Sequence, residues 1–148
     1  MSWTPHVTVA AVIERQGRFL MVEEETSDGV RVNQPAGHLE PGESLLQAVA
    51  RETREETAHG FVPRSLIGVY RWQVPGSGLT YLRFCFHGEV TERFPEQPLD
   101  RGILRLLWLR RSELLGISER LRSPLVLTCV DDYLAGHRHP LELLQEVS

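Results

Sequence analysis

The sequence is poor in cysteine and lacks long apolar runs. Of its 148 residues only Cys85 and Cys129 are cysteines, and both lie within apolar sequence. Two such residues argue against a disulfide framework or a cysteine-based metal site, and they indicate reduced thiols in a protein core. No apolar run approaches the ~20 residues that a membrane-spanning helix needs. We therefore expect a protein without a membrane segment.

Positive charge is also scarce. The chain has 16 Lys and Arg residues against 20 Asp and Glu residues, which gives a formal net charge of −4 and a pI near 5.9. This balance argues against broad electrostatic attraction to nucleic acid or to an anionic membrane. The first residues also lack a basic segment followed by a long apolar one, as a secretory signal would have. We expect a cytoplasmic protein that binds neither nucleic acid nor membrane and that needs a local cation for any anionic ligand.

The length and the 41% hydrophobic content suit one domain, residues 1–148, with a single substantial core. Apolar β-branched runs predict a hairpin from 6–13 and 18–24 and further strands at 65–74, 79–90 and 104–109. Helices are predicted after Ser44, at 111–115 and at 123–134. Periodicity alone thus predicts an α+β or α/β fold.

The segment 37–56, reading GHLEPGESLLQAVARETREE, joins a glycine-rich turn to a helix. Ser44 can cap this helix because its hydroxyl can accept a hydrogen bond from a free amide of the first turn. Gln47, three residues later, completes a capping-box pattern. The helix start is therefore well marked.

Three carboxylates of this helix, those of Glu52, Glu55 and Glu56, fall on one face at about 100° per residue. Like charges at this spacing repel by a few tenths of a kcal/mol per pair. Arg51 and Arg54 can neutralise part of the charge, but Mg²⁺, or Mn²⁺ in its place, suits carboxylate oxygens better and can bridge to phosphates. The pattern predicts a metal–phosphate site. The alternative is a solvated acidic helix face without a ligand.

The spacing of the segment resembles the signature of the Nudix hydrolases, GX5EX7REUXEEXGU, in which U is a bulky apolar residue. Gly37 is followed after five residues by Glu43, and after seven more by the run 51–56, Arg-Glu-Thr-Arg-Glu-Glu. Every charged position of the box, which spans about residues 37–59, is filled. A glycine and five charged residues at fixed positions make this a specific signal.

The match departs from the pattern at its end. Thr53 stands at the first U, and Ala58 and His59 occupy the places of the last glycine and U. Gly60 and Phe61 follow two residues late, which predicts a short insertion before the exit turn.

The resemblance implies a fold, a reaction and roles for the residues of the box. The fold is an α/β/α sandwich on a mixed β-sheet, and the reaction is attack of water on a phosphoric anhydride with divalent metal ions. The implied metal ligands are Glu52, Glu55, Glu56 and the carbonyl of Gly37. The implied catalytic set is Arg51, Glu52 and Glu55, with Arg51 orienting Glu52, whereas Glu43 and Gly42 have structural roles.

Residues outside the helix are candidates for binding substrate and for a further acid. His38, which stands where the box loop often has a second glycine, and Arg71 and Arg83 on the predicted strands are candidates for substrate binding. An exposed arginine is the alternative reading for the last two. The loop 91–102 supplies Glu96 and Asp100 as candidates for a distal catalytic or metal-binding carboxylate.

Segments flanking the box resemble one bacterial phosphatase subgroup of the Nudix family; they read PHVTVAAVI, GRFLMVEEE, NQPAGHLE, LRFCF and LRSPLV. This implies a Mg²⁺-dependent enzyme, monomeric or homodimeric, that releases inorganic phosphate from nucleoside tri- and diphosphates and from thiamine-type pyrophosphates such as thiamine pyrophosphate. Two alternatives stay open. One is another Nudix specificity, for oxidised nucleotides or dinucleoside polyphosphates, and the other is a nucleotide-binding module without turnover.

Overall fold

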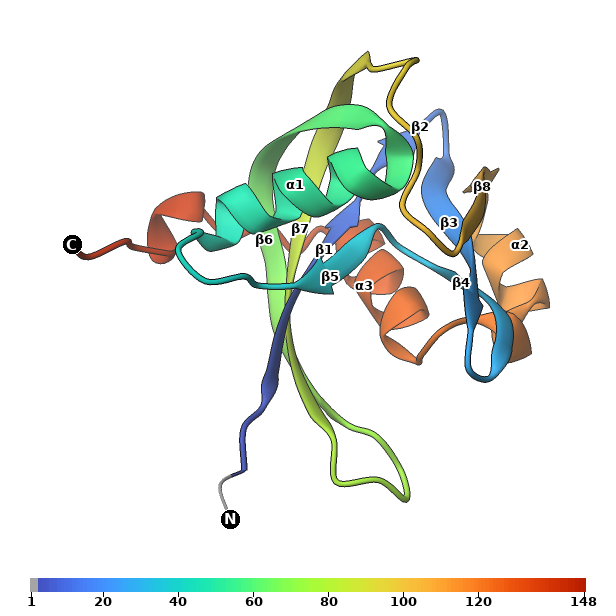
Figure 1. Cartoon of the computed structure of the whole chain (residues 1–148), viewed down its shortest axis with the longest axis horizontal. Helices are drawn as coiled ribbons and strands as arrows, with labels where there is room; N and C mark the ends of the chain where they lie inside the picture. The colour runs from blue at the N-terminus through green and yellow to red at the C-terminus, as the bar shows by residue number, and fades with distance from the viewer. Residues whose placement is uncertain (1–2) are drawn as a thin grey trace.

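The structure, a computed structural model, describes residues 3–148 and contains two β-sheets of four strands each (Figure 1). The first sheet has the order β5-β1-β7-β6. Its strands are β1 (His6–Val12), β5 (Ala36–His38), β6 (His59–Gln73) and β7 (Thr80–Arg93). β1 runs parallel to β7, whereas the other two pairs are antiparallel, so this sheet is mixed.

The second sheet is built around one central strand, β3 (Arg18–Thr26). It pairs antiparallel with β2 (Glu14–Arg15), β4 (Gly29–Asn33) and β8 (Ile103–Leu109). The predicted hairpin of 6–13 with 18–24 forms only next to its turn, where β2 pairs with the start of β3 and the Leu20 amide donates to the Ile13 carbonyl at 2.9 Å. β1 itself pairs with β5 and β7 in the other sheet. Residues 9–12 are buried on both faces of β1, which suits a strand inside a covered sheet rather than one arm of a hairpin.

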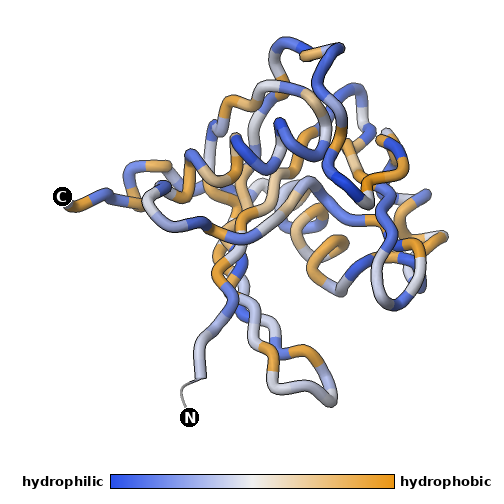
Figure 2. Tube along the Cα trace, in the orientation of Figure 1, coloured by the Kyte–Doolittle hydropathy of each residue, from blue (hydrophilic) through white to orange (hydrophobic). Residues whose placement is uncertain are grey.

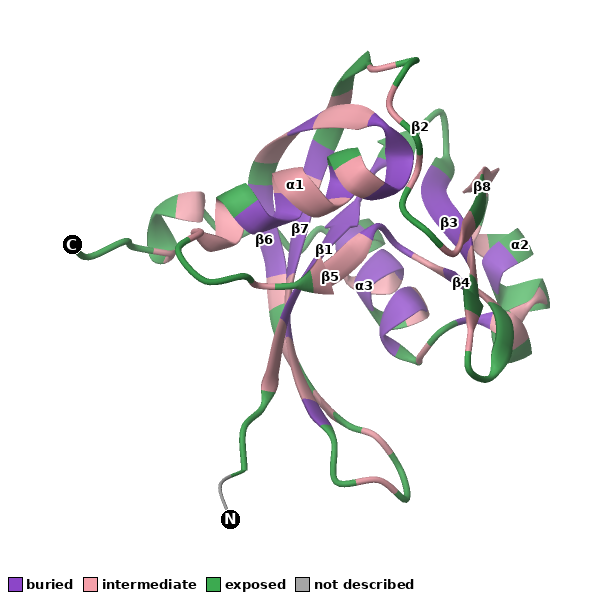
Figure 3. Ribbon diagram, viewed as in Figure 1, coloured by how far each residue is buried: buried purple, intermediate pink, exposed green. Residues whose placement is uncertain are grey.

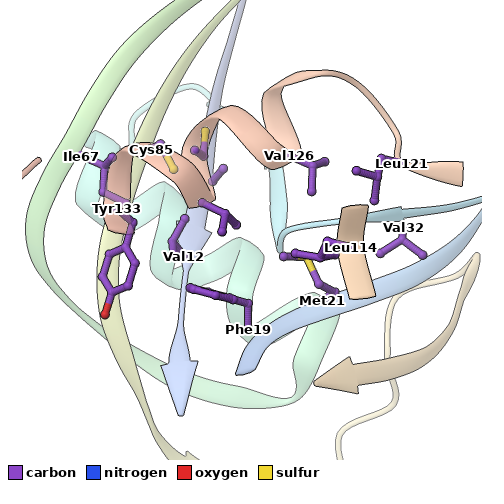
Figure 4. Packing of buried hydrophobic residues seen from close by; sticks show 13 residues of the cluster. Val12, Phe19, Met21, Val32, Ile67, Cys85, Leu114, Leu121, Val126 and Tyr133 are labelled. Atoms are coloured by element: carbon purple, nitrogen blue, oxygen red, sulfur yellow. The ribbon is translucent and has the colours of Figure 1, made fainter. Parts of the chain in front are cut away.

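Helices cover both faces of the first sheet, which gives the predicted α/β/α sandwich. Helix α1 (Leu45–Thr57) lies on one face, where its Ala48 and Val49 pack against Val9 of β1. Helix α3 (Leu125–Leu134) lies on the other face, where Val126 packs in the cluster that Figure 4 shows. The buried residues follow the sheet and the facing sides of both helices (Figure 3).

One short helix and two 3₁₀ turns complete the described fold. Helix α2 (Arg111–Gly116) packs against α3, and two 3₁₀ turns, η1 (Ser118–Arg120) and η2 (Leu141–Leu143), follow α2 and α3. Cys85 and Cys129 are buried free thiols in the α3-side cluster, as expected. Within residues 3–148 no helix is long and apolar enough to cross a membrane.

Helix α1 begins with the predicted capping box. The Ser44 hydroxyl accepts from the Gln47 amide at 3.1 Å, and the Gln47 side chain accepts from the Ser44 amide at 2.8 Å. The helix ends at Ala58, which adopts the left-handed conformation with φ of 56° and donates to the Arg54 carbonyl at 2.8 Å. Ala58 thus takes the conformation usual for a closing glycine, and β6 starts at the next residue. The predicted insertion is absent.

Strands β6 and β7 are longer than predicted, and their far ends project from the body as a two-stranded arm (Figure 1). Trp72 of β6 pairs with Tyr81 of β7 on this arm. Because side chains alternate along a strand, Trp72, Tyr81 and Arg83 share one face, while Arg71 points to the other. Arg71 therefore lies on the other side of the arm from Trp72, Tyr81 and Arg83.

Candidate active site

The side chain of Arg51 joins four groups around the start of α1. Its Nε and Nη2 atoms donate to the two carboxylate oxygens of Glu43 at 2.9 and 2.7 Å. Its Nη1 atom donates to Glu52 at 2.8 Å and to Glu55 at 2.7 Å, and Nη2 also donates to the His38 carbonyl at 2.9 Å. Arg51 lowers the pKa of Glu43, so Glu43 remains a fixed anion that holds the arginine in place.

Three carboxylates converge beside this arginine. Glu52, Glu55 and Asp100 each offer an oxygen atom within 4.8 Å of the others. Two come from the C-terminal half of α1, which is largely hydrophilic (Figure 2), and the third comes from the segment before β8. Hard divalent cations prefer such an all-oxygen set, so the donor chemistry fits Mg²⁺ or Mn²⁺.

Asp100 is held against α1 by a segment that we call the strap, residues 94–100. The guanidinium of Arg54 lies over the ring of Phe94, 3.9 Å from its centroid. Arg54 Nε donates to the Gln97 side-chain oxygen at 2.8 Å, and the Gln97 amide donates back to the Arg54 carbonyl at 3.0 Å. The ring contact and the two hydrogen bonds hold the strap against α1 and fix the position of Asp100.

The two candidates for a distal acid differ in position. The backbone amide of Asp100 donates to the Glu55 carbonyl at 2.9 Å, which brings its side chain to the carboxylate cluster. Glu96, four residues earlier on the same strap, is exposed and lies outside the cluster. The structure thus brings Asp100, and not Glu96, to Glu52 and Glu55.

Strand β5 lies directly against the carboxylates. The Ala36 amide donates to Glu56 at 3.0 Å, and a Cβ atom added at Gly37 would overlap the carboxyl group of Glu52. A side chain at position 37 would therefore displace the carboxyl group of Glu52. Glu56 is not in the three-carboxylate group, but it stands behind Glu52 and is only 8% exposed.

Burial raises the pKa of the clustered acids. The pKa of Glu56 rises to about 9, mainly through burial, with Glu52, Glu24 and Asp100 adding repulsion. Burial also raises the pKa of Glu52 and of Asp100. Glu56, with a pKa of about 9, becomes anionic at neutral pH only beside additional positive charge, which a divalent cation supplies. This property of the site also fits a metal ion.

A cavity of about 510 Å³ opens on the other side of β5, next to Gly37 and His38. Arg83 lines it, whereas Arg71 is exposed on the opposite sheet face and does not. His38 lies 3.1 Å from His6 between ring nitrogens, and burial together with His6 lowers the pKa of His38. Two of the three predicted substrate-binding residues therefore stand at this cavity.

Several site residues escaped the sequence analysis. Tyr81 lines the cavity, and the alternation of residues along the predicted strand 79–90 could have placed it beside Arg83. Gln97 and Phe94 left no signal, because they meet Arg54 across about 40 positions of sequence. Gly42 has a φ of 80° in the turn before α1, which accounts for a glycine there.

The chain is similar to known proteins along most of its length. A family model described as NUDIX domain matches residues 4–126. Phosphatase NudJ of Escherichia coli strain K12 is 43% identical over 140 residues, which cover 95% of this chain and 90% of that protein. A solved structure described as a NUDIX hydrolase from Nitrosomonas europaea is 48% identical, with a TM-score of 0.94 and coverage of 97% and 98% of the two chains. A UDP-X diphosphatase structure, 21% identical with a TM-score of 0.74 over 95% of this chain and 68% of its own, shares the fold.

Proposed function

The chain belongs to the Nudix family of hydrolases acting on phosphoric anhydrides, and we propose that it is a Mg²⁺-dependent phosphatase of nucleotides and thiamine-type pyrophosphates. The family and the likeness to one phosphatase subgroup, both expected from the sequence, are confirmed, and that subgroup is NudJ. The proposal goes further in naming inorganic phosphate as the product and nucleoside tri- and diphosphates and thiamine pyrophosphate as substrates. It also takes the whole chain as one Nudix domain.

One observation carries the proposal. The carboxylate cluster of Glu52, Glu55 and Asp100 stands directly behind Gly37, and the same glycine lines the cavity of about 510 Å³. A phosphate group beside Gly37 would therefore be next to the acids, while the rest of its molecule could occupy the cavity. Known ligand sites have volumes of roughly 300 to 1,000 Å³, so a nucleotide-sized group fits.

We assign the metal to Glu52, Glu55 and Glu56 with the Gly37 carbonyl, and add Asp100 as the distal acid. The chemistry supplied by a bound divalent cation is neutralisation of charge on the phosphate oxygens and activation of the attacking water. Mn²⁺ offers the same oxygen preference and should substitute for Mg²⁺.

The protein's own groups position the reactants and move the proton. Arg51 holds Glu52 and Glu55 at 2.8 and 2.7 Å, so their oxygens do not rotate away when water and phosphate bind. Glu43 in turn fixes Arg51. Glu52 and Asp100, whose pKa values are both raised, are the groups that can accept the proton of the attacking water.

His38 and Arg83 are the substrate-binding residues in this proposal. Both line the cavity, and His38 is adjacent in sequence to Gly37. Arg71, which faces away from the cavity, has no place in it. Phosphate oxygens that extend from the carboxylate cluster into the cavity would come close to the His38 ring and the Arg83 guanidinium.

The test is phosphorus NMR of the products formed from GTP, GDP and thiamine pyrophosphate, with Mg²⁺ and with a chelator. Stepwise release of inorganic phosphate that needs the metal supports the proposal. Pyrophosphate from GTP would move the chain to another Nudix specificity, and no product from any substrate would contradict the proposed function.

A matched pair of variants shows whether the product comes from this site. Glu55→Gln removes one carboxylate charge and should lower turnover at least about 100-fold while the fold survives. Glu92→Gln, at an exposed glutamate near the end of β7, should leave the rate unchanged. Equal rates in the two variants would contradict the metal assignment.

A further inference from the structure

The cavity beside Gly37 has an aromatic wall. Trp72 and Tyr81, paired across β6 and β7, both line the cavity, and their rings lie 6.1 Å apart with planes 23° from parallel. The His6 ring lies 5.2 Å from that of Tyr81 and the His38 ring 6.3 Å, so the aromatic surface continues to β5. Neither Trp72 nor Tyr81 is fully buried, so both rings present aromatic surface to the cavity. Such a surface favours stacking with a planar ring.

The same cavity contains a buried arginine without a counter-ion. Arg83 is only 5% exposed, and it follows Tyr81 by two residues on the same face of β7. It donates to the Gln34 side chain at 2.9 Å and to Asn33 at 3.4 Å, both neutral amides, and more weakly to the Cys129 sulfur at 4.0 Å. Among residues 3–148 it forms no ion pair, and its Nε atom has no hydrogen-bond partner.

A buried charge of this kind is costly unless something compensates it. The acids on the cavity wall do not: Glu24 pairs with Arg122 at 3.4 Å, and Asp28 is exposed on the turn between β3 and β4. Arginine offers only donors, so a group that complements Arg83 must present acceptors. Carbonyl oxygens on the edge of a planar ring meet this requirement, whereas a cationic ring does not.

We propose that this cavity is the specificity site for the group attached to the phosphates, and that it binds an oxo-bearing heteroaromatic ring such as guanine. The ring stacks on Trp72 and Tyr81 and directs its carbonyl edge toward Arg83. The inference rests on the proposed function, and it ranks the substrate classes: nucleotides with a carbonyl-bearing base bind better than adenine nucleotides or the cationic thiamine group.

The test measures binding alone and therefore does not depend on turnover. GMP and ribose 5-phosphate, which carry the same phosphate with and without a ring, are titrated into the full chain by calorimetry with Mg²⁺ present. We expect GMP to bind at least about 10-fold more tightly, in line with the contribution of one stacked base. Equal affinities, or no measurable binding of GMP, would overturn the proposal.

Variants locate the ring. Trp72→Leu should lower the affinity for GMP to that for ribose 5-phosphate and leave the affinity for ribose 5-phosphate unchanged. Trp72→Phe, which keeps a stacking face, should retain most of the difference in affinity between the two ligands. Loss of affinity for both ligands would show a structural effect and contradict a stacking role.

The role of Arg83 is tested by comparing GMP with AMP, which has an amino group in place of the carbonyl. Arg83→Lys keeps the charge but loses the planar fork, and should reduce the preference for GMP over AMP. An unchanged preference in a folded variant would exclude Arg83 from reading the ring. Should Arg83→Lys fail to fold, the Trp72 pair and the wild-type preference for GMP still decide the proposal.

These outcomes are separable from those of the proposed function. Binding of GMP that depends on Trp72, with no phosphate release from any substrate, would leave the cavity assignment standing and remove the phosphatase. Phosphate release from GTP that is unaffected by Trp72→Leu would leave the phosphatase standing and remove the cavity assignment.

Discussion

Arg51 holds both carboxylate oxygens of Glu43 in a two-pronged ion pair, with N–O distances of 2.9 and 2.7 Å. The planar guanidinium can grip Glu43 with two nitrogens and still reach Glu52 and Glu55 with its third. A lysine ammonium is a single point of charge and cannot keep all three contacts in one geometry. The identity of this residue, and not only its charge, therefore determines the shape of the carboxylate cluster.

Arg51→Lys should lower kcat/KM by about 10- to 100-fold, because a small misplacement of catalytic groups is costly. The measurement is steady-state phosphate release with GTP, together with a melting curve that verifies the fold. Arg64→Lys, at an exposed arginine that pairs with Glu89 across β6 and β7, serves as the control and should behave as wild type. A fully active Arg51→Lys variant would contradict the role given to the two-pronged pair.

Asp100→Asn should reduce the rate at least about 10-fold and raise the Mg²⁺ concentration that gives half-maximal rate, since one carboxylate charge leaves the cluster. Glu96→Gln, on the same strap but outside the cluster, should change neither quantity. The check is a Mg²⁺ titration of initial rates. If both variants respond alike, the distal acid is wrongly assigned.

Gly37→Ala should abolish most of the activity, because the added methyl group overlaps the carboxyl group of Glu52 and forces it out of place. Gly42→Ala is the instructive control. At Gly42 nothing lies within 4 Å of an added Cβ, but the φ of 80° strains any side chain. We expect it to lower stability by about 1 kcal/mol with turnover preserved. Melting curves and rates of both variants measure this. Preserved turnover in Gly37→Ala, with lost turnover in Gly42→Ala, would contradict the role given to Gly37.

Glu56→Gln should stabilise the metal-free protein at neutral pH while reducing turnover. The pKa of Glu56 rises from an ordinary 4.5 to about 9 in the fold. Between these values the folded state retains a proton that the unfolded chain releases, so wild-type stability falls as pH rises from about 5 to 9. Glutamine is neutral throughout and can still accept from the Ala36 amide.

The stability difference should therefore reach about 4 kcal/mol near pH 7.5, three pH units above 4.5, and vanish near pH 4. Thermal melts in chelator across this range measure it. Excess Mg²⁺ should reverse the order, because it binds the wild-type carboxylate more tightly than the amide. A variant less stable than wild type at every pH would contradict the burial argument.

The parts of the site that lie close together in sequence could be predicted. The capping box at Ser44 and the proximity of Glu52 and Glu55 follow from helix geometry alone, and the box spacing indicated the family. Glu56, predicted on the same face, lies outside the three-carboxylate group because it is buried and accepts from the Ala36 amide. The helix end was misjudged because Ala58 adopts a left-handed conformation that its residue type disfavours.

The parts that depend on distant contacts could not be predicted. Nothing local distinguishes Asp100 from Glu96, because the choice is made by hydrogen bonds between the strap and α1. The partner of β1 is likewise set by the covered sheet and not by the turn that follows it. Arg71 and Arg83 differ by the face they occupy, which requires the pairing of β6 with β7.

We expect the strap to give the enzyme two thermal limits in place of one. Its Phe94 and Gln97 hold it to Arg54 of α1, and its release would expose little of the core. Segments with few buried contacts open at a lower free energy than the whole fold. Heating would then release Asp100 while both sheets remain intact, so that catalysis stops, reversibly on cooling, before the protein melts.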